Sequence, residues 1–420
     1  MKLPRNTALH VALALSAERV VPVGRLALDR RGAVLEYDPS FVAGGLAVNP
    51  LAPPALGPIP AREPRTFDGM HGIFADSLPD AWGTELVRRR CEREGIRFES
   101  LNALDRLAIV GKRGMGALTY RPDIPDDGSD TIDFDALAHE ANEILEGRDS
   151  DLLPELERLG GASGGALPKV LVALNADGHA RSGAGDIPDG YDAWLVKFPS
   201  SHDVKDIGPL EAAYAGMARA ARIDVPDHRL IPAGANAPAY FASKRFDRAA
   251  GRVRRHVVSV AGVLDIDWTV PQIDYDVLLR LVLRVTRSQH EVEEMFRRMV
   301  FNIVAHNRDD HAKQHAFISD DAGHWRLAPA YDLTYSTGPN REHYLAVNGQ
   351  AADVDADAVR AVADNHRIKP RRLRAIVGDV LDAAARFDDI AGEAGVSKRT
   401  AANARRAIAP SIARIAPLAK

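Results

Sequence analysis

The stretch HNRDDHAKQH, residues 306–315, contains two aspartates, three histidines, an arginine and a lysine. The apolar stretch MVFNIVA precedes it and AFIS follows it, and both flanks have the composition of buried structure. A charged segment between two buried flanks is expected to lie in a cleft rather than in a fully solvated loop. The sequence therefore points to residues 306–315 as the first candidate for a functional site.

The spacing inside this stretch suits phosphoryl transfer. In protein kinases a catalytic aspartate precedes a metal-binding asparagine by five positions, because one loop presents a base to a hydroxyl group and an amide oxygen to magnesium. Here Asp309 precedes Gln314 by five, and a further acid, Asp332, follows in LAPAYDLTYS. One carboxylate would take the hydroxyl proton and the other would bind the metal. The structural alternative for these acids is a helix cap or a solvated loop.

Three weaker signals precede this stretch in the order that ATP-dependent phosphotransferases require. The glycine-rich GGASGGALPK, residues 160–169, would let backbone N–H groups approach phosphate oxygens, although a flexible turn has the same composition. Lys197 lies in the apolar AWLVKFP, where a buried ammonium group needs an anion unless it reaches solvent at a sheet edge. Glu211 lies near the start of the next helix, where it could hold that lysine or simply favour the helix dipole.

The elements that must position these residues change along the chain. Short strands are predicted in HVALAL, RVVPVGRLALD and AVLEYD, and a helix is predicted after Pro79. Further strands are predicted in ALPKVLVALN, DAWLVKFPS, AYFASKRFD and HVVSV. From about residue 275 the apolar spacing becomes helical, as in Val292, Met295, Phe296, Met299 and Ile303. This order of strands before helices predicts an α+β protein.

Composition excludes several classes. With 420 residues, 46% hydrophobic and 27% charged, the chain is long enough for two or three domains with large cores. A net charge of -4 gives no overall attraction to nucleic acid, so any basic patch must be local. The single cysteine, Cys91, excludes an intrachain disulfide framework. A single cysteine also fits a reducing compartment, and no apolar run reaches about 18 residues, so we expect a cytoplasmic protein without a membrane span.

Six motifs in order resemble the HipA-like serine/threonine kinases, the toxins of bacterial toxin–antitoxin pairs. The motifs are GGASGGALPKVLVA, WLVKFP, EAAYAGMARAARIDVP, KRFDR, NRDDHAKQHAF and WRLAPAYDL, while VGRLALD and FADSLPDAWG resemble the N-terminal subdomain of the family. The resemblance implies a two-lobed, kinase-like α+β fold in three parts. These are an N-terminal subdomain (1–125), a strand-rich ATP-binding part (155–265) and a helical lobe with the catalytic loop (270–420). The acidic DIPDDGSD, residues 123–130, is the best candidate for a boundary, and ATP is expected between the strand-rich and helical parts.

The resemblance also implies roles for individual residues. Asp309 would be the catalytic base, Gln314 and Asp332 would bind Mg²⁺, and Lys197, held by Glu211, would contact the ATP phosphates. The remaining expected nucleotide-site residues are Lys244 and Phe246 at adenine, Asp247 near the ribose, and His311 and Lys313 in the loop. Gln314 departs from the family, which has asparagine there, so metal binding could be weaker. Ser163 corresponds to a serine that can be autophosphorylated in the family.

The same resemblance implies partners. It predicts a small helix-turn-helix antitoxin, operator DNA reached through that antitoxin, and a protein substrate such as an aminoacyl-tRNA synthetase or another component of translation. Phosphorylation of such a substrate would inhibit growth.

Three other interpretations stay open at this point. His306, Asp309, Asp310, His311 and His315 could line a two-metal hydrolase site, although this leaves the glycine-rich loop, Lys197 and Glu211 without roles. A non-catalytic regulator that only binds nucleotide is kept open by Gln314. The basic segments RIKPRRLR (367–374) and SKRTAANARR (397–406) could contact nucleic acid, but such clusters are more often solvated helix faces.

Overall fold

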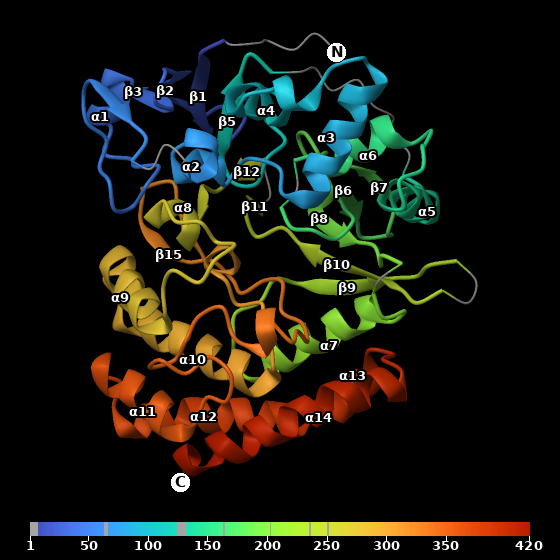
Figure 1. Cartoon of the computed structure of the whole chain (residues 1–420), viewed down its shortest axis with the longest axis vertical. Helices are drawn as coiled ribbons and strands as arrows, with labels where there is room; N and C mark the ends of the chain where they lie inside the picture. Colours follow the sequence, from blue (N-terminus) through green and yellow to red (C-terminus); the bar gives the residue numbers. More distant parts are fainter. Residues whose placement is uncertain are drawn as a thin grey trace. The chain divides into compact units, whose positions relative to one another are not determined.

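The computed structural model describes residues 7–62, 66–123, 132–162, 164–201, 203–234, 237–249 and 252–420 (Figure 1). The chain divides into two compact units. Unit 1 comprises residues 1–203, 233–266 and 318–324, and unit 2 comprises residues 204–232, 267–317 and 325–420. Sheets and helices occur together, which confirms the α+β class. The acidic stretch expected as a boundary lies, apart from Asp123, outside the described residues.

The first sheet of unit 1 is built from the strands predicted near the N-terminus. Its order is β4 (Pro58–Pro60), β3 (Ala33–Tyr37), β2 (Val20–Leu28), β1 (Leu9–Ala14) and β5 (Leu118–Arg121). All neighbouring pairs are antiparallel. Alternate residues of β1, Leu9, Val11 and Leu13, are buried, as the period of two in a strand requires.

The second sheet of unit 1 presents the predicted phosphate-contact lysine. Its neighbouring strands are β7 (Ala180–Ser182), β6 (Lys169–Asn175), β8 (Tyr191–Lys197) and β10 (Tyr240–Lys244). The first six residues of β6 are buried, and after Lys169 they form the continuous apolar run 170–174. Lys197, at the end of β8, is in register with Lys169 on β6 and with Phe241 on β10.

The glycine-rich loop before β6 is held by the start of α3 (Ala81–Arg93), within unit 1. The Asp80 carboxylate accepts a hydrogen bond of 2.7 Å from the Gly165 N–H, and the Trp82 N–H donates to the Gly165 carbonyl at 3.3 Å. The Trp82 indole N–H also donates to the Lys169 carbonyl at 3.1 Å. The FADSLPDAWG segment therefore fixes the glycine-rich loop from both sides of Gly165.

The other elements of unit 1 are short. They are α1 (Pro39–Ala43), α2 (Gly72–Ala75), α4 (Ala103–Val110), α5 (Phe134–Leu145), α6 (Leu153–Gly160), β11 (Arg248–Ala249), β12 (Val253–Arg254), β13 (Val257–Ser259) and α8 (Val260–Leu264). β14 (Ala316–Ser319) begins in unit 2 and ends in unit 1.

Unit 2 is mainly helical, as the spacing after residue 275 predicts. Its elements are α7 (Ile207–Ala220), β9 (His228–Ile231), α9 (Tyr275–Thr286), α10 (Gln289–Ala305), β15 (Trp325–Leu327), α11 (Ala356–Asn365), α12 (Pro370–Ala385), α13 (Phe387–Glu393) and α14 (Lys398–Ile415). The predicted apolar face of α10 is buried and packs among α9, α12 and α14 (Figure 1). The Tyr214 hydroxyl of α7 donates to the Ala305 carbonyl at 2.8 Å and so fixes the end of α10.

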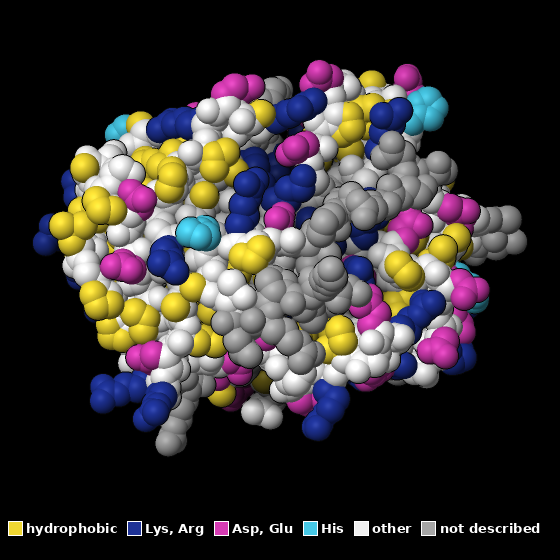
Figure 2. All heavy atoms as spheres, turned by 90° about the horizontal axis from the view of Figure 1, so that it is seen from above, with side chains coloured by type: hydrophobic (Ala, Val, Ile, Leu, Met, Phe, Trp, Pro, Cys, Tyr) yellow, Lys and Arg dark blue, Asp and Glu magenta, His cyan; other side chains and the backbone are white. Residues whose placement is uncertain are grey.

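Charge is unevenly distributed over the surface despite the small net charge. On the face shown in Figure 2, lysine and arginine side chains gather near the middle, with acidic side chains scattered around them. Among the described residues, no helix is both long enough and apolar enough to cross a membrane.

The close approach at the end of α6 generates a stability prediction. A Cβ atom at Gly160 would lie 2.6 Å from the Lys169 carbonyl oxygen and 3.0 Å from the Trp82 indole nitrogen. We expect Gly160→Ala to lower the free energy of unfolding by about 1–3 kcal/mol, because the backbone must shift. Gly378→Ala in α12 is the control, since a Cβ there has open space, and it should raise stability by up to about 1 kcal/mol. Equal urea midpoints for the two variants would contradict this packing.

Candidate functional site

The candidate catalytic loop leaves α10 through a backbone turn. His306 caps the helix in the left-handed conformation, with φ of 56°. A short parallel bridge then joins Asn307 to Ser336. The Ser336 N–H donates to the His306 carbonyl at 3.1 Å, and the Arg308 N–H donates to the Ser336 carbonyl at 3.3 Å. The loop is therefore fixed to the segment that follows Asp332 at the residues just before Asp309.

The two adjacent aspartates of the loop occupy opposite environments. The Asp310 side chain is fully buried and accepts hydrogen bonds from the Tyr275 hydroxyl at 2.8 Å, His343 Nδ1 at 2.9 Å and the Tyr344 N–H at 2.9 Å. The Asp309 side chain is 45% exposed. Asp310 therefore anchors the loop, and Asp309 is the carboxylate that a substrate can reach.

The Asp310 anchor continues into a buried polar chain. Burial alone would raise the pKa of Asp310, but attraction to His343 and the hydrogen bonds from His343 and Tyr275 hold the pKa below its ordinary value. The Asn302 amide donates to the Tyr275 hydroxyl at 3.0 Å, and the Asn307 amide donates to the Asn302 carbonyl oxygen at 3.0 Å. These bonds connect the loop to α9 and α10 through groups that water does not reach.

Aromatic rings surround the histidine beside Asp309. Nδ1 of His311 accepts from the Lys313 N–H at 3.2 Å, so its Nε2 is left to face Asp309, 3.8 Å from Oδ1. The His311 ring lies 4.7 Å from the Trp268 ring and 5.3 Å from the Tyr344 ring, between centroids. Nζ of Lys313 lies 5.5 Å from the Trp268 ring centroid, which is a cation–π contact. The expected roles of His311 and Lys313 at the nucleotide stay predictions.

The two predicted metal ligands meet in the structure. The Gln314 side-chain amide donates to Asp332 Oδ2 at 2.8 Å. Gln314 is half-buried and Asp332 is exposed, with a left-handed φ of 56° that turns this residue out of the preceding chain direction. The neighbouring Tyr331 hydroxyl donates to the Lys313 carbonyl at 2.6 Å, which ties the two segments together. An amide oxygen, after rotation of the Gln314 amide, and a carboxylate are hard oxygen ligands that fit Mg²⁺.

The two residues expected to form an ion pair near the phosphates lie in different units. Lys197 in unit 1 is partly buried, and its Nζ lies 5.9 Å from the Phe241 ring centroid. Glu211 in unit 2 lies on α7 and is buried. Their pairing stays a prediction.

Lys244, Phe246 and Asp247, the residues expected at adenine and ribose, differ in their contacts. Lys244 forms an ion pair with Asp192 at 2.8 Å, and Phe246 is partly buried. Asp247 is fully buried between Arg245, at 2.7 Å, and Arg248, and it accepts from the Gly116 N–H at 2.7 Å. Burial opposes the charge of Asp247, but the two arginines hold its pKa far below the ordinary value. A ribose contact by Asp247 would require these bonds to be exchanged, and the expected roles of Lys244, Phe246 and Asp247 at the nucleotide stay predictions.

Ser163, the expected autophosphorylation site, lies outside the described residues. Its described neighbour Gly164 accepts a hydrogen bond of 2.6 Å through its carbonyl from Nζ of the buried Lys169.

The geometry does not support the two-metal hydrolase interpretation. Asp310 already accepts three hydrogen bonds, and His306 stacks on Tyr335 with ring centroids 5.6 Å apart. Within the described ranges, no group of three or more histidine, cysteine, aspartate or glutamate side chains is placed to hold a metal ion. A pair made of Gln314 and Asp332 is a different kind of site.

Sequence reasoning missed the side chains that position the loop. Tyr275 and His343, which bind Asp310, lie 35 and 33 positions away from it in the chain. No local pattern connects residues so far apart. Trp268 could have been found from its setting, because a large aromatic ring in the polar stretch DIDWTVPQ is unusual for a loop.

Comparisons with known proteins identify the family. The model of the HipA-like C-terminal domain matches residues 161–387, and that of the HipA N-terminal domain matches residues 18–121. The chain therefore belongs to the HipA-like family.

Two similar proteins can be named. A relative from Sinorhizobium fredii, named "Putative kinase Y4dM", is 32% identical over 279 residues, which are 62% of this chain and 61% of the relative, so the match spans about three fifths of that protein. HipA of Shewanella oneidensis MR-1, solved with HipB and operator DNA, superimposes over 97% of each chain with a TM-score of 0.68 and 16% identity. This likeness shows that the fold is HipA-like.

The buried anchor generates a prediction about stability. Tyr275→Phe removes one donor to Asp310 and leaves the Asn302 amide without its acceptor. We expect the free energy of unfolding to fall by about 1–3 kcal/mol in urea titrations, because buried polar groups lose their partners. Tyr191→Phe is the control, since Tyr191 contacts the Arg181 guanidinium with its ring, which phenylalanine keeps, and it should change stability little. A Tyr275→Phe protein as stable as the control would show that the anchor contributes nothing.

A second prediction concerns pH. Burial lowers the pKa of His315 to about 4, compared with about 6.5 for an unperturbed histidine. The unfolded chain therefore binds more protons between these pH values, and the free energy of unfolding should fall as the pH is lowered from 6.5 to 4. His315→Asn should reduce this slope, whereas His290→Asn, which changes an exposed side chain, should leave it unchanged. Urea titrations at several pH values measure the slopes, and identical slopes for all three proteins would refute the assignment.

Proposed function

We propose that this protein is an ATP- and Mg²⁺-dependent serine/threonine protein kinase of the HipA-like type. One observation carries the proposal: a half-exposed Asp309 lies on a loop anchored by its buried neighbour Asp310, and five residues later Gln314 meets Asp332 at 2.8 Å. An accessible base beside an oxygen-ligand pair is the arrangement that phosphoryl transfer needs.

Each residue then has a separate task. Asp309 accepts the proton of a substrate serine or threonine hydroxyl. The hydroxyl oxygen then bonds to the terminal phosphorus of ATP, and the bond between this phosphorus and the ADP oxygen breaks. Gln314 and Asp332 would hold Mg²⁺, which supplies neutralising charge to the phosphates. Lys197 would contact the phosphates, and Lys313, beside Trp268, would steady the transferred group. Backbone groups of Lys244 and Phe246 would receive adenine.

The proposal extends to partners. The HipA-like fold, whose Shewanella member was solved with HipB and operator DNA, supports a small helix-turn-helix antitoxin as the partner of this chain, with operator DNA bound through it. Its protein substrate would be a component of translation, and phosphorylation would slow growth when the antitoxin is absent.

The test separates binding from chemistry. Transfer of labelled phosphate to protein in a cell extract, and calorimetric titration with Mg-ATP, are measured for the purified variants. Asp309→Asn should lower transfer by about 100-fold to 10,000-fold with ATP affinity nearly intact, because a general base acts in the transition state. Asp332→Asn and Gln314→Leu should weaken Mg-ATP binding as well as transfer, whereas Gln314→Asn should keep or raise activity. Asp357→Asn, at a highly exposed position of α11, is the control and should match the wild type.

Two results would change the assignment. If the wild type binds Mg-ATP but transfers no phosphate, the chain is a nucleotide-binding regulator. If Asp309→Asn loses ATP binding while Asp332→Asn keeps full activity, the roles assigned to the two aspartates are wrong.

A further inference from the structure

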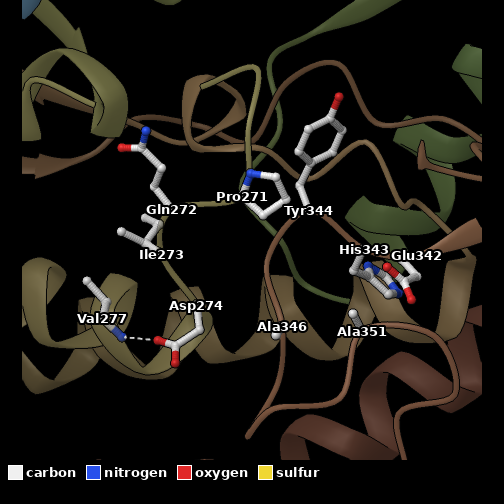
Figure 3. Close-up of a pocket in the computed structure, with 10 residues that line it drawn as sticks. All are labelled: Pro271, Gln272, Ile273, Asp274, Val277, Glu342, His343, Tyr344, Ala346 and Ala351. Atoms are coloured by element: carbon white, nitrogen blue, oxygen red, sulfur yellow. Dashed lines mark hydrogen bonds between the residues drawn. The ribbon is translucent and has the colours of Figure 1, made fainter. Parts of the chain in front are cut away.

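A pocket of about 360 Å³ lies in unit 2, next to the catalytic loop (Figure 3). One wall is the segment before α9, with Pro271, Ile273 and Asp274, and the other is the segment from Glu342 to Ala351. Its volume is within the range of about 300–1,000 Å³ that is usual for ligand pockets. The described residues assigned to catalysis and metal binding do not line this pocket, so it needs its own explanation.

Tyr344 connects the pocket to the candidate base. Its side chain lines the pocket, and in Figure 3 the ring points away from Ala346 and Ala351. Its backbone N–H donates to Asp310, and its ring packs edge-on against His311, whose Nε2 is 3.8 Å from Asp309. The proximity of Asp309 also contributes to the raised pKa of Tyr344, after the larger effect of burial. The pocket is therefore connected to Asp309 through the rings of Tyr344 and His311.

The lining of the pocket is apolar with negative charge. Pro271, Ile273 and Val277 contribute apolar surface, and Asp274 and Glu342 contribute carboxylates. The lining includes no lysine or arginine. Glu342 is exposed and makes no ion pair within the described part of the chain, whereas Asp274 accepts a hydrogen bond of 2.8 Å from the Val277 N–H through one oxygen.

Two basic side chains near the pocket already have hydrogen-bond partners. His343 lines it, but Nδ1 of its ring is bonded to Asp310 at 2.9 Å. The Arg308 guanidinium donates to the carbonyls of Arg341 and Ala352, which flank the pocket segment. The carboxylate of Glu342 is therefore open to a cation from outside the chain.

We propose that this pocket receives a lysine or arginine side chain of the protein substrate, adjacent in sequence to the hydroxyl that is phosphorylated. The inference rests on the proposed kinase function. The aliphatic stem of such a side chain would lie along Pro271 and Ile273, and its charged end would face Glu342 and Asp274. Apolar or acidic residues at that position would leave the carboxylates desolvated without a partner.

The experiment uses fluorescent peptides with one central serine flanked by arginine, glutamine or glutamate. Anisotropy measures binding to the full-length protein without ATP, and labelled phosphate measures transfer with Mg-ATP. We expect the arginine peptide to bind best. Its dissociation constant should rise about 2-fold to 5-fold in Glu342→Gln and about 10-fold in Glu342→Lys, as expected for a partly exposed ion pair.

Glu393→Lys is the matched control, because it changes the net charge equally at an exposed position of α13. It should bind all peptides as the wild type does, and thermal unfolding checks that each variant is folded. Equal binding of the three peptides, or equal losses in Glu342→Lys and Glu393→Lys, would overturn the pocket assignment. Preferred binding of the arginine peptide without any phosphate transfer would support the pocket and overturn the kinase proposal. Phosphate transfer without a preference among the peptides would support the kinase proposal and overturn the pocket assignment.

Discussion

The burial of the Asp310 carboxylate is the constraint on which the rest of unit 2 depends. A charge that water does not reach is tolerated only when its lone pairs are satisfied, and Asp310 obtains its donors from Tyr275, His343 and Tyr344. These come from the start of α9 and from the segment after residue 340, so one side chain brings three parts of the chain together. The loop cannot move without breaking bonds that have no replacement in solvent. The buried Asp310 therefore makes the loop rigid, while the exposed Asp309 keeps its carboxylate accessible.

Asp309 and Asp310 are adjacent carboxylates in different environments, so one can anchor the loop while the other stays accessible. The Asp310 side chain is fully buried, whereas the neighbouring Asp309 side chain is 45% exposed. Asp309 has His311 beside it at 3.8 Å and keeps access to solvent. The oxygen pair made by Gln314 and Asp332 follows on the same loop and on the segment bridged to it. The candidate site is thus formed by residues close together in the chain, and hydrogen bonds from residues distant in the chain hold it in place through Asp310.

Sequence alone predicted the parts of the molecule that depend on local pattern. The buried face of α10 and the strands β6 and β8 follow from periodicity. The family resemblance named Gln314 and Asp332 together as metal ligands; their side chains form a hydrogen bond, and their binding of Mg²⁺ stays a prediction. Sequence could not predict the burial of Asp247. Its donor Gly116 lies 131 positions away, and the pattern of its two neighbouring arginines is typical of a solvent-exposed charged segment. The same holds for Tyr275 and His343 at Asp310. A buried ion cluster gives no periodic pattern in the sequence, because the tertiary fold brings its members together from distant positions.

The contacts of Asp80 and Trp82 with Gly165 also have a consequence for biosynthesis. Residues 80–82 leave the ribosome about 80 residues before the glycine-rich loop, and N-terminal segments of larger proteins tend to fold first. The first sheet and α3 can then form a surface against which the glycine-rich loop packs after it leaves the ribosome. The N-terminal region acts in this sense as an internal template, because the glycine-rich loop acquires its shape from a segment that is already folded.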